Sequence, residues 1–242
     1  MLIGEIGVTT VSHEAHIHEA QTIILRELLF LPSARFAQLQ KATTLESDHV
    51  KFHIARLVEL GYVVKNDHVY SLTPTGKEYA NKLDTDVNRI ERQPKSAIIL
   101  VIENNEGQLL VQERLKHPYF GFWGFAGGKI RWGETILEAA GRELMEETGL
   151  KATLMYRGVY HELTNSHETQ EVLEDKIFHV VYGSDPQGEL IQDFEGGHNE
   201  WLGLESIESK DKKYKSFDLE LSVGRGEQSF IEAEQVYEKG EF

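Results

Sequence analysis

The 242-residue sequence contains no cysteine, only 5 prolines and no hydrophobic run long enough to span a membrane. Without cysteine, neither a disulfide framework nor a thiolate metal site can form. The apolar first eight residues include Glu5 and lack a basic segment, so they do not have the pattern of a signal peptide. These absences predict a cytoplasmic globular protein with no membrane partner.

Basic side chains are also scarce relative to acidic ones. Lys and Arg number 25 against 40 Asp and Glu, which gives a formal net charge of −15. This balance argues against a general binder of nucleic acid or anionic membranes. The acidic excess is uneven, because residues 1–90 hold 9 basic and 11 acidic side chains and residues 91–242 hold 16 and 29. We therefore expect two different domains.

One dense pattern of fixed spacing lies between residues 128 and 150. It reads Gly-x5-Glu-x7-Arg-Glu-apolar-x-Glu-Glu-x-Gly-apolar and is formed by Gly128, Glu134, Arg142, Glu143, Leu144, Glu146, Glu147, Gly149 and Leu150. At typical residue frequencies, its seven fixed identities would arise by chance about once in 10⁸ starting positions. The pattern is therefore specific.

The spacing predicts one helix with an acidic face. Residues 134–148 are rich in helix formers and carry an apolar stripe of Ile136, Leu137, Ala140 and Leu144. At about 100° per residue, Glu143, Glu146 and Glu147 fall within an arc of about 100°. Carboxylate oxygens are the ligands that hard divalent cations prefer. The alternative is a merely solvated acidic face, which would not need Arg142 and Glu134 at fixed offsets.

This pattern resembles the Nudix box, the signature of enzymes that hydrolyse a nucleoside diphosphate linked to another moiety. The resemblance extends over residues 95–225 and implies an α/β fold, the Nudix α/β/α sandwich with a mixed sheet, in a domain of residues 95–242. Strands are expected at 96–102, 108–113, 152–160 and 176–183, the last ended by residues 183–186. The resemblance also implies Mg²⁺ or Mn²⁺ as the cofactor and a nucleotide-type substrate.

By position, Glu143, Glu146 and Glu147 match the metal ligands of the family, and Glu146 or Glu147 could also assist as a base. The resemblance implies supporting roles for two further residues. Arg142 is expected to orient the glutamates, and Glu134 to hold the loop and the helix together.

Outside the helix, the resemblance implies two further metal ligands. The backbone carbonyl of Gly127 matches a family ligand, and the preceding residue departs from the family because Ala126 stands where proline is usual. Many members add an acidic residue from a later loop, and Glu200, just before Trp201, is our first choice for it. The alternative for Glu200 is a solvated loop charge.

Three residues are candidates for substrate binding. Arg114 stands about where the family often has a phosphate-contacting arginine, and Lys129 could meet a phosphate. Trp123, with Phe122 beside it, could stack on a base. The alternatives are a surface charge at a strand end for Arg114 and core packing for the aromatic residues. The family's proline or tyrosine markers of substrate class are absent.

The N-terminal part predicts helices at 18–31, 35–41 and 46–60, strands at 62–64 and 69–72, and a helix from Pro74 to about Arg89. Pro94 marks the domain boundary. Residues 15–90 resemble a winged helix-turn-helix of bacterial transcription regulators, which implies a small α+β winged-helix domain over residues 1–91.

The 46–60 helix matches the recognition helix of such regulators. Lys51, His53 and Arg56 are expected on its outer face, where they could contact duplex DNA as part of a homodimer. Residues 41–70 balance four basic and four acidic side chains, so non-specific affinity for DNA should be low. Dimerisation and contact with the other domain are the alternatives.

Two functions follow. The first is a metal-dependent pyrophosphohydrolase that cleaves the diphosphate linkage of a nucleoside triphosphate, an oxidised nucleotide, ADP-ribose or a nucleotide sugar. The second is a transcription regulator that senses a nucleotide through the Nudix domain and binds DNA through the winged helix. The intact box favours the enzyme, as does the domain order, since related regulators usually carry the winged helix after the Nudix domain.

Overall fold

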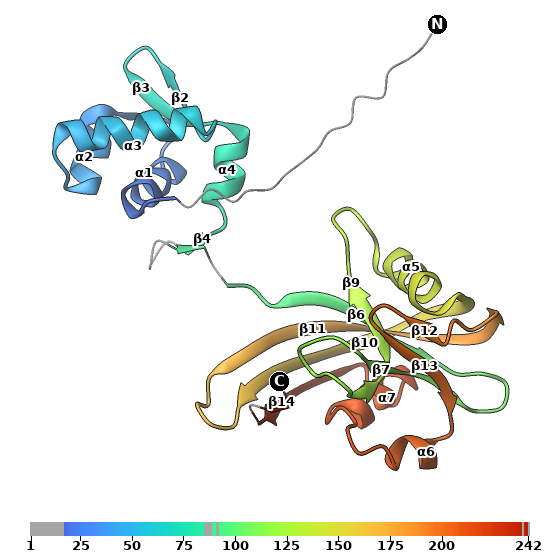
Figure 1. Ribbon diagram of the computed structural model, residues 1–242. Coiled ribbons are helices and arrows are strands. Elements are labelled where there is room, and N and C mark those ends of the chain that lie inside the picture. Colours follow the sequence, from blue (N-terminus) through green and yellow to red (C-terminus); the bar gives the residue numbers. More distant parts are fainter. Residues whose placement is uncertain (1–16, 85–88, 91, 239, 242) are drawn as a thin grey trace, which may run out of the picture. The chain divides into compact units, whose positions relative to one another are not determined.

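The computed structural model describes residues 17–84, 89, 90, 92–238, 240 and 241 (Figure 1). The chain divides into two compact units, Met1–Arg92 and Gln93–Phe242. Residues 1–16 of the predicted N-terminal domain lie outside the described residues. No helix in the described part is long and apolar enough to cross a membrane.

The first unit places four helices around a small antiparallel sheet of order β1-β3-β2. Its elements are α1 (Glu19–Leu29), β1 (Ala34–Arg35), α2 (Phe36–Thr43), α3 (Ser47–Glu59), β2 (Val63–Asn66), β3 (Val69–Leu72), α4 (Pro74–Ala80), β4 (Leu83–Asp84) and β5 (Arg89–Ile90). Apolar side chains from α1, α2, α3, β2 and β3 form one core. The predicted order of elements is present, with β1, β4 and β5 in addition.

The last predicted helix of this unit is too long. Thr73 accepts a hydrogen bond from the Gly76 amide at 2.9 Å and Pro74 occupies the first turn, so the helix begins as predicted. It ends at Ala80 instead of near Arg89. The helix ends early because the chain turns back after it and buries the Leu83 side chain, which is 6% exposed, in the core. Leu83 belongs to β4, which pairs with β5.

The second unit is built on a five-stranded mixed sheet of order β14-β10-β11-β6-β9 and a four-stranded sheet of order β12-β13-β7-β8. Its elements are β6 (Lys95–Ile102), β7 (Leu109–Arg114), β8 (Trp123–Gly124), β9 (Ala126–Lys129), α5 (Ile136–Thr148), β10 (Leu150–Ser166), β11 (Val172–Gly188), β12 (Asp193–Phe194), β13 (Gly197–Leu202), α6 (Leu204–Glu208), α7 (Phe217–Gly224) and β14 (Phe230–Tyr237).

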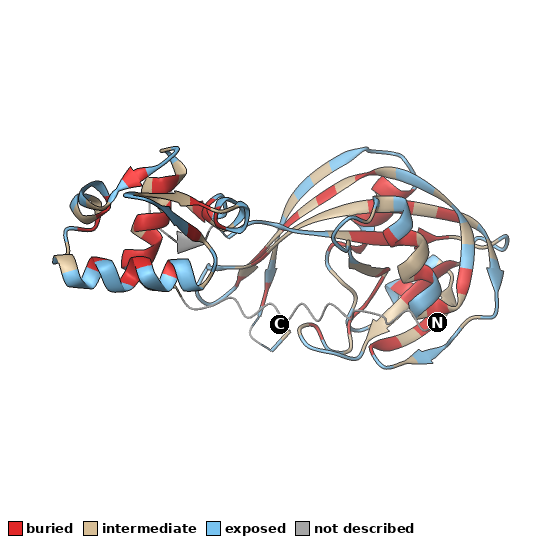
Figure 2. Ribbon diagram, turned by 90° about the horizontal axis from the view of Figure 1, so that it is seen from above, coloured by how far each residue is buried: buried red, intermediate tan, exposed pale blue. Residues whose placement is uncertain are grey.

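Alternation along β6 gives this unit two cores. Ile98 and Leu100 pack with Leu144 of α5, whereas Ile99 and Val101 pack with residues of α7 that include Phe217. Figure 2 shows the buried residues on the inner faces of strands and helices. Helices therefore cover both faces of the sheet, and the predicted α/β/α sandwich with a mixed sheet is confirmed.

The hairpin of β10 and β11 is longer than predicted. Each strand has 17 residues, and β11 continues through the 183–186 segment that was expected to end it. The buried face of the extension is polar, which the apolar pattern did not reveal. There, Glu162 accepts hydrogen bonds from the Tyr160 and Thr164 hydroxyl groups at 2.7 and 3.1 Å.

Candidate active site

Local sequence sets both ends of α5. Thr135 accepts a hydrogen bond from the Glu138 amide and the Glu138 carboxylate accepts one from the Thr135 amide, so the helix starts with a capping box. Gly149 ends it in the left-handed conformation at φ 73°. Of the predicted apolar stripe, Ala140 and Leu144 are buried but Leu137 is 47% exposed.

The strand before the helix leaves space for a carboxylate. A Cβ atom on Gly128 would lie 2.1 Å from the carboxyl carbon of Glu143. Only glycine lets Glu143 of α5 lie against β9 in this way. The neighbouring Gly127 is paired with Ile99 of β6, and a Cβ atom there would lie 2.5 Å from the carbonyl oxygen of Ile98.

Arg142 is the centre of the hydrogen-bond network. Its Nε and Nη2 donate to the two carboxylate oxygens of Glu134 at 2.6 and 2.8 Å, and Nη2 also donates to the Lys129 carbonyl at 3.0 Å. Its Nη1 donates to Glu143 at 2.6 Å and to Glu146 at 3.2 Å. Hydrogen bonding to Arg142 lowers the pKa of Glu134 to about 2. Arg142 thus ties the loop to the helix and holds two of the three glutamates.

Glu147 is held by uncharged side chains. Gln112 of β7 donates to its carboxylate at 3.0 Å, and Asn199 of β13 donates to its backbone carbonyl at 2.9 Å. Burial raises the pKa of Glu147; the Gln112 hydrogen bond lowers it, and repulsion from Glu143 raises it further. The sequence analysis missed Gln112 and Asn199. Asn199 is fully buried, and its place at Glu147 depends on the pairing of β13 with β7, which no local sequence pattern shows.

Glu146 is more exposed than the other two. Its carboxylate accepts a hydrogen bond from Arg131 at 3.1 Å in addition to the one from Arg142. Glu143 and Glu146 thus share Arg142, whereas Glu147 is held by Gln112, and no three acidic or histidine side chains among the described residues already stand together as a metal-binding group.

The donor set nevertheless fits a hard divalent cation. It offers carboxylate oxygens from one helix face, and the repulsion between Glu143 and Glu147 is what a cation between them would relieve. Glu143 and Glu147 would hold the cation, and Glu146 would join them by giving up Arg131. The role of the Gly127 backbone carbonyl as a metal ligand stays a prediction.

Glu200 lies in β13, not in a loop as expected, and faces away from the other glutamates. Neighbouring residues of β13 alternate between the faces of the sheet, and Asn199 is the one that contacts Glu147. Glu200 is paired with Val111, a residue of the core on the α7 side, and forms an ion pair with Lys210 at 3.2 Å. Its predicted role as a metal ligand does not fit this position.

The predicted substrate-binding residues are dispersed. Arg114 donates to the carbonyl groups of Pro118 and His117 at 2.6 and 3.3 Å, so it braces the loop after β7. Lys129 is exposed beside the Arg142 network. Trp123 is 9% exposed in the core, and the Lys210 ammonium group lies 3.4 Å from the centre of its ring. The ring therefore already has a packing partner.

The residues predicted to contact DNA differ in exposure. The expectation that His53 lies on the outer face of α3 is wrong, because its side chain is 9% exposed and its ring stacks on His18 at 4.5 Å. Lys51 and Arg56 are exposed, but each forms an ion pair within α3, with Asp48 at 2.9 Å and Glu59 at 2.7 Å.

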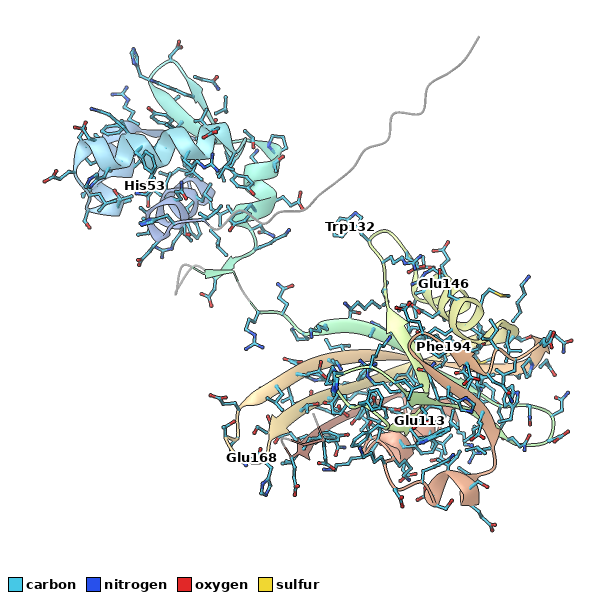
Figure 3. All side chains as sticks on the ribbon, in the orientation of Figure 1. His53, Glu113, Trp132, Glu146, Glu168 and Phe194 are labelled. Atoms are coloured by element: carbon cyan, nitrogen blue, oxygen red, sulfur yellow. The ribbon has the colours of Figure 1, made fainter. Side chains whose placement is uncertain are left out.

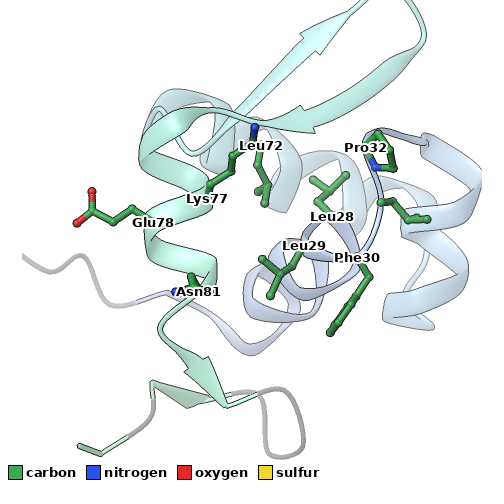
Figure 4. A pocket seen from close by; sticks show the side chains of 9 residues that line it. Leu28, Leu29, Phe30, Pro32, Leu72, Lys77, Glu78 and Asn81 are labelled. Atoms are coloured by element: carbon green, nitrogen blue, oxygen red, sulfur yellow. The ribbon is translucent and has the colours of Figure 1, made fainter.

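The first unit also contains an apolar pocket of about 760 Å³ (Figure 4). The end of α1 and the helix α4 line it, with Leu28, Phe30 and Lys77 among its residues. None of the predicted site residues lies in it.

A mixed sheet covered by helices on both faces, with an arginine-centred group of glutamates on one helix, is the arrangement expected of a Nudix domain. The chain belongs to the NUDIX domain family, which it matches over residues 93–221, that is 129 of its 242 residues.

Two curated relatives show the range of the family. Over 86 residues the chain is 35% identical to a Methanocaldococcus jannaschii protein named ADP-ribose pyrophosphatase, in a match that covers 34% of this chain and 50% of the relative. Over 100 residues it is 32% identical to a Bacillus subtilis protein named putative 8-oxo-dGTP diphosphatase, covering 41% and 58%. The chain thus spans about half the length of these relatives.

Among solved structures, a MutT protein from Bacillus halodurans resembles the chain with a TM-score of 0.49 and 18% identity. The match covers 61% of this chain and 93% of that one.

Proposed function

We propose that the protein is a divalent-metal-dependent pyrophosphohydrolase that cleaves the diphosphate linkage of a nucleoside diphosphate derivative. The observation that carries this proposal is the α5 network, in which Arg142 holds Glu134, Glu143 and Glu146 while Gln112 holds Glu147. The substrates named for the two curated relatives, ADP-ribose and 8-oxo-dGTP, are the first to test.

The residues divide the work. A bound divalent cation supplies charge neutralisation at the diphosphate and makes a bound water easier to deprotonate. Glu143 and Glu147 would hold the cation. Glu146 or Glu147 would also assist as a base. Arg142 and Glu134 fix the loop against the helix and keep the donor atoms aligned.

The test is a hydrolysis screen with Mg²⁺ or Mn²⁺ over nucleoside triphosphates, oxidised nucleotides, ADP-ribose and nucleotide sugars. We expect turnover of at least one class, its loss in excess EDTA, and a drop in kcat of at least about 10² in Glu147→Gln. Glu205→Gln, an exposed change on α6, is the matched control and should keep full activity. Full activity in EDTA or in Glu147→Gln would refute the proposal.

Duplex-DNA binding through α3 is a second candidate function. It is supported by the order of helices and hairpin in the first unit and by the exposed Lys51 and Arg56. The ion pairs of these two residues with acidic neighbours, and the burial of His53, reduce the positive charge that α3 offers to phosphates.

A further inference from the structure

Trp132 is the most exposed large hydrophobic residue among the described residues. It lies at the tip of the loop between β9 and α5, and its relative exposure is 103% (Figure 3). No stacking or cation–π partner for its ring is found in the part of the chain that the structure describes. An exposed indole adds nothing to the core, so packing does not explain a tryptophan at this position.

The loop that carries the indole is anchored. The Glu134 amide donates to the Arg131 carbonyl at 3.0 Å, and Gly133 has φ 81°, as in a turn with Trp132 and Gly133 at its centre. The Arg131 amide donates to Glu134 at 2.9 Å, and the Arg131 guanidinium donates to Glu146. The turn therefore fixes the backbone of Trp132 next to Arg131, whose guanidinium contacts the candidate metal ligand Glu146.

This position favours an aromatic ligand that is joined to the diphosphate. Lys129 is exposed at the end of β9, just before this loop, and offers a positive charge to a phosphate, whereas the neighbouring Arg131 is paired with Glu146. Every base has a π-face, so stacking of a base on an aromatic side chain needs no hydrogen-bond partner from the protein. The exposed ring offers such a surface on the loop whose Arg131 contacts Glu146.

We propose that Trp132 is a specificity-determining residue that stacks on the nucleobase of the substrate while the diphosphate lies at the α5 carboxylates. This inference rests on the proposed function and assigns a residue of this chain to the nucleobase of the substrate. A diphosphate without a base lacks the stacking contact and binds less tightly.

The experiment measures binding in the full-length protein with Mg²⁺ by calorimetry, with ADP as the aromatic probe. The comparison ligand is 5-phosphoribosyl diphosphate, which has ribose and diphosphate but no base. Trp132→Ala should weaken ADP binding at least fivefold and leave 5-phosphoribosyl diphosphate unchanged. Trp132→Phe should bind ADP within about twofold of the parent protein, because a phenyl ring still stacks. Leu137→Ala, which removes another exposed apolar side chain near the start of α5, should change neither affinity.

Fluorescence gives an independent readout. Trp132 is the fully exposed tryptophan, whereas Trp123 and Trp201 pack against the two cores, so acrylamide quenching reports mainly on Trp132. ADP should protect it and 5-phosphoribosyl diphosphate should not. The inference is overturned if ADP does not bind, if Trp132 stays accessible with ADP bound, or if Trp132→Ala weakens both ligands equally. Protection by ADP without turnover of any substrate would refute the hydrolase proposal and uphold the stacking role.

Discussion

Gly127 and Gly128 of β9 both lack a side chain for a reason, but the reason differs between them. At Gly128 the space belongs to the Glu143 carboxylate, which is the flexible end of a side chain. At Gly127 the space belongs to the Ile98 carbonyl of the neighbouring strand, which is backbone and cannot move without disturbing the ladder. One glycine therefore makes room for a candidate ligand and the other for the fold.

This difference predicts that alanine mainly lowers activity at one of the two positions and mainly lowers stability at the other. Gly128→Ala should displace the Glu143 carboxylate and lower kcat at least about tenfold, with a loss of stability below about 1 kcal/mol. Gly127→Ala should destabilise the second unit by about 1–3 kcal/mol through overpacking. Urea unfolding followed by tryptophan fluorescence, together with hydrolysis kinetics, separates the two. Full activity in Gly128→Ala would show that Glu143 does not need its place against β9.

At the scale of elements, the sequence predicts what a local pattern determines. The helix formers and the apolar stripe of residues 134–148 predict α5 closely, and apolar runs predict β6 and β7. The local pattern fails to predict segments whose buried side chains are polar. The ends of β10 and β11 bury Glu162 and Glu174. The partners of these glutamates lie in the same strand or far away in the sequence, so no apolar periodicity marks the two segments.

The candidate site follows the same rule. The α5 glutamates, Arg142 and Glu134 come from one continuous pattern and were predicted together. Gln112 and Asn199 reach Glu147 from two other strands, and only the pairing of β7 with β13 places them there. Glu200 was misplaced because the face of a strand depends on its register, which the sequence of β13 alone does not give.

The helix α7 carries a buried acid with a measurable consequence. Burial raises the pKa of Glu220 to about 8 from an ordinary value of 4.5; repulsion from Glu162 adds to this, while the Ser216 hydroxyl, which donates at 2.7 Å, and Lys176 oppose it. The folded state therefore holds a proton that the unfolded chain releases. Its contribution to stability is complete below about pH 4.5 and is lost as the pH rises to about 8.

Replacing this acid should remove that pH dependence. Between pH 5 and pH 8, Glu220→Gln should flatten the fall in the free energy of unfolding by up to about 1.4 kcal/mol per pH unit. All three tryptophans lie in the second unit, so their fluorescence follows its unfolding in urea. Glu227→Gln, an exposed change, is the control. Identical pH profiles for Glu220→Gln and the parent protein would show that Glu220 titrates normally.

At the scale of the whole molecule, the question is whether the two units communicate. A ligand shifts an equilibrium only if it binds two states with different affinity. An enzyme with an accessory DNA-binding unit would show no such coupling, whereas a sensor requires it.

Glu146→Gln is suited to this test because it should retain unhydrolysed substrate. After selection of a duplex from a random pool at low salt, we expect ADP-ribose or 8-oxo-dGTP with Mg²⁺ to change the DNA affinity of the variant by no more than about threefold, a coupling below ~0.7 kcal/mol. A change of tenfold or more would make regulation the main function. A pool from which no duplex is enriched would reject DNA binding through α3.

The two arginines around α5 neutralise the negative charge of its glutamates. Because Arg131 and Arg142 already occupy carboxylate oxygens of Glu146 and Glu143, an incoming cation competes with them for the same atoms. A diphosphate offers the arginines an alternative anionic partner. We therefore expect metal and substrate to enter as an exchange of counter-ions, with each making room for the other, so that the site is fully assembled only when both are present.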